Sequence, residues 1–69
     1  MVVDFYEGIL GDSRDLNEVY AVSSQAIQKF GYFECMVVQY ALLCEPLEGF
    51  PRVTWEQIRA IVAVLKGKP

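Results

Sequence analysis

The chain has 69 residues, of which 54% are apolar and 22% are charged, and its formal net charge is −3. This length leaves room for one domain, residues 1–69, and the high apolar content excludes an intrinsically disordered chain. The sequence has no histidine and only two cysteines, which removes the residues on which most metal and catalytic sites depend. We therefore expect no metal, no cofactor and no enzymatic activity.

The first residues of the chain carry apolar side chains at helical spacing. The members of this pattern are Val2, Phe5, Tyr6 and Ile9. Gly8 or Gly11 would end such a helix, because glycine is common just past a helix C-terminus. A short helix is the favoured prediction for this segment, and a strand over residues 2–6 is the alternative.

A longer helix is predicted over residues 13–30. Asp12 or Ser13 is a suitable N-cap, and Asp15 would place a negative charge in the first turn. Gly31 follows a basic residue closely and is suited to end the helix. The predicted apolar stripe contains Leu16, Val19, Tyr20, Ile27 and Phe30, and Ser23 interrupts it.

Residues 32–44 are predicted to form the next helix, and most of its circumference is apolar. One line along its surface carries the acidic residues and is expected to face water: Glu34, Val38, Ala41 and Glu45. A helix that is apolar over most of its circumference is typical of the centre of a fold. Pro46 would end this helix, and Leu47 and Phe50 are expected to hold the following segment against the core.

Gly31 decides whether residues 13–44 form one helix or two. If the first helix continued through Gly31, its apolar stripe would run onto the line of Glu34 and Val38, so that the apolar face would turn by half a turn. One straight helix cannot bury both halves in a single core. A break at Gly31 is favoured, and a continuous helix, which would require a dimer, is the alternative.

The last helix is predicted over residues 54–66. Thr54 and Gln57 have the spacing of a capping box, and Val53 and Ile58 have that of a hydrophobic staple. One face of this helix carries Trp55, Ile58, Ile61, Val62 and Leu65.

The two cysteines, Cys35 and Cys44, lie nine positions apart in the same predicted helix. Their separation along the axis would be about 13 Å, which is too long for a disulfide. We expect both to be small buried apolar residues.

The predicted fold is therefore all-α, with three main helices (about 13–30, 32–44 and 54–66) and a short N-terminal segment that is also helical. The other helices are few and short, and they cannot easily cover the apolar surface of the helix over residues 32–44. We therefore expect a homodimer, which would bury that surface.

The residues expected to contact a partner or a second copy form an aromatic and methionine-rich band. They are Tyr32, Phe33, Met36, Gln39, Tyr40 and Leu43. Interface cores are rich in such residues and poor in charge. Packing of the same band inside the chain is the alternative. A charged contact surface is expected at Glu34, Arg52, Arg59 and Lys66.

The sequence thus predicts a small protein–protein interaction protein, acting as a binder, an inhibitor or a regulatory adaptor. The alternative is a small dimeric DNA-binding transcriptional regulator that uses the basic C-terminal helix; otherwise we expect no nucleic-acid partner. We expect a cytoplasmic protein without a membrane span, because the N-terminus is acidic and the long weakly charged run of residues 30–44 is too short to cross a bilayer.

Overall fold

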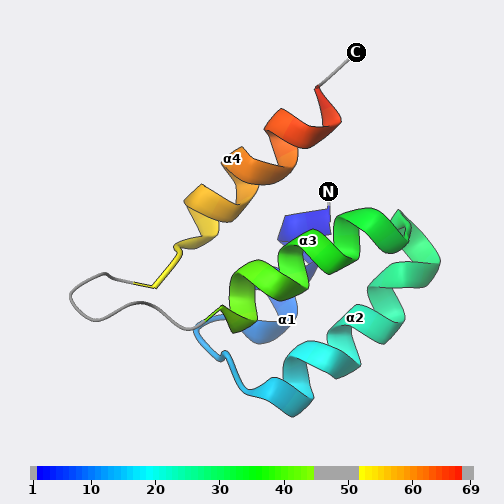
Figure 1. Cartoon of the computed structure of the whole chain (residues 1–69). Coiled ribbons are helices and arrows are strands. Elements are labelled where there is room, and N and C mark those ends of the chain that lie inside the picture. Colours follow the sequence, from blue (N-terminus) through cyan, green and yellow to red (C-terminus); the bar gives the residue numbers. More distant parts are fainter. Residues whose placement is uncertain (1, 45–51, 68–69) are drawn as a thin grey trace.

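A computed structural model describes residues 2–44 and 52–67, which form four α-helices and contain no strand. The helices are α1 (Val2–Leu10), α2 (Leu16–Phe30), α3 (Tyr32–Leu43) and α4 (Trp55–Lys66). In Figure 1, α2 and α3 run antiparallel as a helical hairpin, and α1 lies behind α3. Helix α4 packs against α1 and α3. The all-α prediction is confirmed, and residues 2–6 are helical, so the alternative of a strand there is wrong.

The start of α4 follows the predicted pattern. The Thr54 hydroxyl accepts a hydrogen bond from the Gln57 backbone N–H (3.1 Å), and the Thr54 N–H donates to the Gln57 side-chain carbonyl (2.8 Å). This reciprocal pair is a capping box, which satisfies two backbone donors that the helix itself leaves unpaired. Val53 is partly buried against the core and Ile58 is fully buried, as a hydrophobic staple requires.

The start of α2 differs from the prediction. The N-cap is Asp15, whose carboxylate accepts a hydrogen bond from the Glu18 N–H (3.2 Å), so that the helix begins at Leu16 and not at residue 13. The Ser13 N–H donates to the Leu10 carbonyl (2.9 Å) and thereby completes the turn that follows α1. Ser13 therefore lies in the connection between α1 and α2, outside the helix that it was expected to begin.

The core is formed by one face of each helix. Its buried apolar members are Val2, Val3, Tyr6, Leu10, Val19, Val22, Ala26, Cys35, Val38, Leu42, Ile58 and Val62. The stripe predicted for α2 is therefore displaced: Leu16 and Tyr20 are about half exposed, and Val22 and Ala26 take the buried positions. In α1, Ile9 is likewise exposed, and Val3 and Leu10 are buried.

A tyrosine connects three helices inside this core. The Tyr6 hydroxyl of α1 lies 2.8 Å from the Ser23 hydroxyl of α2 and donates to the Cys35 carbonyl of α3 at 3.3 Å. Burial raises the pKa of Tyr6 to about 12. The serine that interrupts the apolar stripe of α2 is therefore the hydrogen-bond partner of a buried phenol.

Cys35 is fully buried with a free thiol, as predicted, whereas Cys44 is exposed, so the prediction for Cys44 is wrong. Cys44 follows the last turn of α3, on the line of the exposed Phe33 and Tyr40. The expectations for Glu45, Leu47 and Phe50 fall outside the described residues. None of the helices within residues 2–44 and 52–67 has the length and apolar content needed to cross a membrane.

Candidate functional site

Gly31 sets the orientation of α3. Its φ of 98° and ψ of 152° lie in a region that L side chains rarely adopt. The same residue is the C-cap of α2 and the N-cap of α3. The predicted break at Gly31 is thus confirmed, and the alternative of one continuous helix over residues 13–44 is wrong. The break turns α3 back along α2 (Figure 1).

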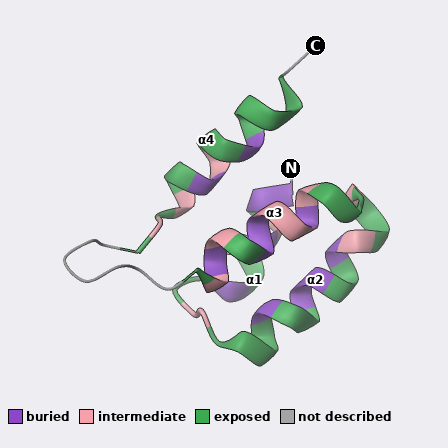
Figure 2. Ribbon diagram, in the orientation of Figure 1, coloured by how far each residue is buried: buried purple, intermediate pink, exposed green. Residues whose placement is uncertain are grey.

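The two faces of α3 are assigned differently from the prediction. Val38, expected on a line that faces water, is completely buried, and Cys35, Gln39 and Leu42 share its side of the helix. The opposite side carries Phe33, Val37 and Tyr40 at spacings of i, i+4 and i+7. Figure 2 shows buried and exposed positions alternating along α3. The expected water-facing line is therefore wrong: apolar residues cover almost the whole circumference of α3, and Glu34 reaches the edge of the buried side.

Three aromatic side chains of α3 are left largely exposed. Phe33 has 65% of its surface accessible and Tyr40 has 70%, and Tyr32, at the first turn, has 68%. Three members of the predicted band are thus on the surface. Met36 and Leu43 are partly buried against the core, and Gln39 is buried. For these three residues, the alternative of packing inside the chain is the better description.

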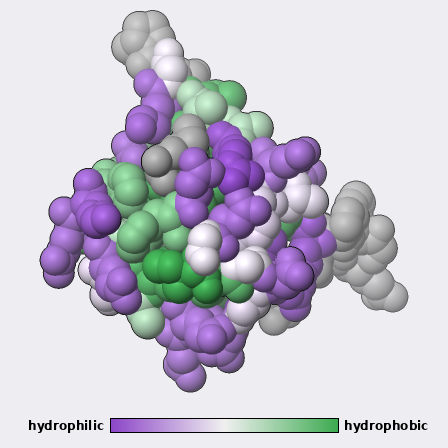
Figure 3. Space-filling view, turned by 180° about the vertical axis from the view of Figure 1, so that it is seen from behind, coloured by the Kyte–Doolittle hydropathy of each residue, from purple (hydrophilic) through white to green (hydrophobic). Residues whose placement is uncertain are grey.

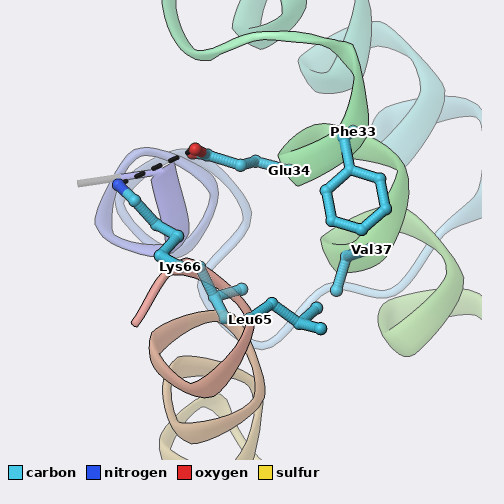
Figure 4. A pocket seen from close by; sticks show the side chains of 6 residues that line it. Phe33, Glu34, Val37, Leu65 and Lys66 are labelled. Carbon is cyan, nitrogen blue, oxygen red and sulfur yellow. Dashed lines mark ion pairs between the residues drawn. The ribbon is translucent and has the colours of Figure 1, made fainter. Parts of the chain in front are cut away.

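A groove lies between the exposed side of α3 and the last turns of α4. Its volume is about 190 Å³, and its lining residues are Phe33, Glu34, Val37, Val62, Leu65 and Lys66. Figure 4 shows Phe33 and Val37 on one wall and Leu65 on the other. The carboxylate of Glu34 and the ammonium of Lys66, 3.7 Å apart, close one side of the groove as an ion pair.

The apolar surface continues from this groove along α4. Ile61, Val64 and Leu65 are exposed large apolar residues, and together with Ala60 they line a shallow, almost entirely apolar depression. Ile61 and Leu65 share the predicted apolar face with Ile58 and Val62, yet α1 and α3 cover only a narrow stripe of α4 around Ile58 and Val62. We call Phe33, Val37, Tyr40, Ile61 and Leu65 the α3–α4 surface.

The face on the α1 side also exposes apolar atoms, which hydrophilic side chains surround (Figure 3). Phe5 and Phe30 are partly buried and pack edge to face, with ring centroids 5.6 Å apart. The ammonium of Lys29 lies 5.3 Å from the centroid of the Phe5 ring. This aromatic pair is therefore already engaged within the chain, unlike the rings of the α3–α4 surface.

The four charged residues expected to form one contact surface lie in three places. Glu34 and Lys66 pair at the groove. Arg59 binds Asp4, with its Nη2 2.8 Å from Oδ1, and also Glu7, both on α1. These hydrogen bonds raise the pKa of Arg59, and the same contact lowers the pKa of Asp4. Arg52 is exposed near the start of α4.

Within the described residues, no group of three or more cysteine, aspartate or glutamate side chains is placed to hold a metal ion. Burial raises the pKa of the Cys35 thiol, which disfavours the reactive thiolate. The residues of the α3–α4 surface that the sequence analysis did not predict are Val37 on α3 and Ile61 and Leu65 on α4. The sequence contains a signal for the exposed part of α4. When Val64 is included, the apolar stripe of this helix is wider than two neighbouring helices can cover.

Comparisons with protein-family models, with curated proteins and with solved structures find no match to this chain.

Proposed function

We propose that this protein acts by binding another protein through the α3–α4 surface, and that a second copy of the chain occupies this surface in a homodimer when no other partner is bound. The observation that carries the proposal is the pair of exposed rings, Phe33 and Tyr40, beside an apolar groove. Aromatic residues without nearby free charge are enriched in the cores of protein interfaces.

The size of the groove favours a protein partner over a small molecule. Its volume of 190 Å³ lies below the roughly 300–1,000 Å³ of pockets that hold small-molecule ligands. A groove of this size suits one apolar side chain, and the flat rings and aliphatic side chains beside it suit the remainder of an interface. The Glu34–Lys66 pair at its edge would belong to the polar rim.

A second copy is the simplest occupant, because the surface offers both an exposed ring and an apolar groove. In a symmetric dimer the same patch meets itself, so the Tyr40 or Phe33 ring of each copy can pack on the α4 residues of the other. A chain of this size also gains stability from association, since one small core rarely supplies more than about 3–5 kcal/mol.

The test is the mass in solution, measured by size exclusion with light scattering at micromolar concentration under reducing conditions. We expect twice 7.8 kDa for the wild type, and 7.8 kDa for a Phe33→Ala/Tyr40→Ala double variant that stays folded. Tyr20→Ala is the matched control, since Tyr20 is a half-exposed tyrosine on α2. A monomeric wild type that also fails to bind a dye for exposed apolar surface would contradict the proposal.

The alternative of a DNA-binding regulator has less support. Arg59 and Lys66, two of the basic residues on which it depends, are both in ion pairs with carboxylates. Phosphate contacts dominate DNA affinity, so these pairs would have to break first. Retardation of duplex DNA at low salt, lost on raising the salt, would support this alternative over the interaction protein.

We place this activity in the cytoplasm as part of the same proposal. Its support is the free thiol of Cys35, which lies in the core. Free thiols are typical of reducing compartments.

A further inference from the structure

A second cavity lies at the opposite end of α4 from the groove. Its volume is about 290 Å³, and its lining residues are Asp12, Arg14, Arg52, Val53, Thr54 and Trp55. The connection between α1 and α2 supplies Asp12 and Arg14, and the segment that enters α4 supplies the rest. Two arginines from segments far apart in the sequence, Arg14 and Arg52, therefore line the same cavity.

Arg14 is held in place before any ligand arrives. Its Nη2 donates to the Val53 carbonyl at 2.6 Å, and its guanidinium carbon lies 5.5 Å from the centroid of the Trp55 ring. Trp55 is itself fixed, because its indole N–H donates to the Gly11 carbonyl at 2.9 Å. Donors positioned in advance lose little conformational entropy on binding a ligand.

Besides Asp12, which lines the cavity itself, the acidic residues nearest to Arg14 in sequence are Asp15 and Glu18, and both have other partners. Asp15 caps α2, and Glu18 accepts a hydrogen bond from the Ser13 hydroxyl. Within residues 2–44 and 52–67, neither Arg14 nor Arg52 forms an ion pair. Burial and the charge of Arg52 both lower the pKa of Arg14, so the two cations repel each other across the cavity.

We propose that this cavity binds a single carboxylate group, held between Arg14 and Arg52. Guanidinium groups match carboxylates geometrically, with two parallel N–H donors for the two oxygens. The two arginines and one aspartate that line the cavity have a formal net charge of +1, which one carboxylate balances. The apolar walls at Val53 and Trp55 would contact the carbon atoms attached to that carboxylate. The site does not depend on the α3–α4 surface and adds a second binding activity.

Trp55 is the single tryptophan of the chain, so its fluorescence and its indole N–H resonance report on this cavity alone. The experiment titrates the full-length protein at neutral pH and constant ionic strength. The probes are sodium acetate, a blocked Gly-Glu-Gly peptide and inorganic phosphate, with sodium chloride as the reference. Acetate represents a free organic acid, and the peptide represents an acidic side chain of a protein.

We expect a saturable change of the Trp55 signals with acetate or with the peptide in the millimolar range, and the tighter of the two identifies the source of the carboxylate. Arg52→Gln should weaken this binding at least about tenfold, because a hydrogen-bonded ion pair is lost. Arg52→Lys should weaken it less, since the charge remains. Lys29→Gln, which removes the same charge far from the cavity, should leave it unchanged.

Three results would overturn the inference. The first is no saturation beyond the chloride reference, and the second is an equal response in wild type and Arg52→Gln. The third is tighter binding of phosphate than of either carboxylate. The Phe33→Ala/Tyr40→Ala variant separates this inference from the proposed function, because its loss of self-association should leave the Trp55 response intact.

Discussion

Helices α2 and α3 form one hairpin but use their apolar residues in different ways. In α2, polar residues cover one side, and burial of the other side leaves little apolar surface besides Leu16 and Tyr20. In α3, apolar residues lie on both sides, so that burial of Val38 and Leu42 necessarily exposes Phe33 and Tyr40. The comparison shows that a helix with apolar residues all round leaves an apolar surface for a partner, whichever of its faces enters the core.

The largest expected effect tests which side of α3 is buried. Val38→Asp should unfold the protein, because an unpaired charge would enter the core at a cost of about 4 kcal/mol or more. Circular dichroism and urea denaturation measure this. Phe33→Asp, on the other side of the same helix, should leave the monomer folded and remove only the stability that self-association supplies. A folded Val38→Asp protein would show that the buried side is assigned wrongly.

The next largest effect on stability is expected at Gly31, where α2 and α3 meet. Gly31→Ala should lower the free energy of unfolding by about 1–3 kcal/mol, because its φ of 98° strains any L side chain. Gly8→Ala is a control that should change the free energy of unfolding in the opposite direction. Gly8 lies inside α1 with open space around it, so the alanine should stabilise the protein by about 0.5–1 kcal/mol. Thermal unfolding of both variants compares them, and equal shifts would contradict the junction geometry.

A smaller effect on stability is expected from the hydrogen bond between Tyr6 and Ser23, the polar residue on the buried side of α2. Tyr6→Phe removes the hydroxyl that contacts Ser23 and should cost about 1–2 kcal/mol, since the serine is left buried without this partner. Replacing Ser23 by Ala in the same protein should recover part of the loss. Urea titrations of the two single variants and the double variant measure the coupling. Additive losses would show that the two hydroxyls do not interact.

The raised pKa of Tyr6 leads us to expect a weak dependence of the free energy of unfolding on pH. Its folded pKa of about 12 lies above the ordinary value of 10, so its stabilising effect is complete below pH 10 and is lost as the pH rises toward 12. At about pH 10.5 the loss should be roughly 1 kcal/mol. Urea denaturation at increasing pH measures this loss of stability, and the Tyr6→Phe variant should not show the part of the loss that comes from Tyr6. An unchanged slope in Tyr6→Phe would assign the loss to other groups.

The features that could be predicted from the sequence are those decided locally. The capping box of Thr54 and Gln57 and the helix break at Gly31 depend on residues within one turn of each other. The start of α2 was missed by a few residues, because Asp12, Ser13 and Asp15 are all suitable caps and the path of the chain after α1 selects among them.

The orientation of α3 could not be predicted, because its apolar residues define no preferred side and Val38 looks as suitable for the surface as Val37. The role of Ser23 depends on Tyr6, 17 positions earlier. The arginine pair depends on Arg14 and Arg52, which become neighbours only when the chain folds. Each of these features requires knowledge of which segments meet.

The shared cap at Gly31 also has a consequence for the order in which the chain folds. Because α2 ends and α3 begins at one residue, their contacts close almost no loop and form early at little entropic cost. The pairing of α4 with α1 joins Arg59 to Asp4, 55 positions apart, and must await a much longer closure. We therefore expect the hairpin to assemble before α4 closes over it, and folding kinetics of variants in α3 and α4 would test this order.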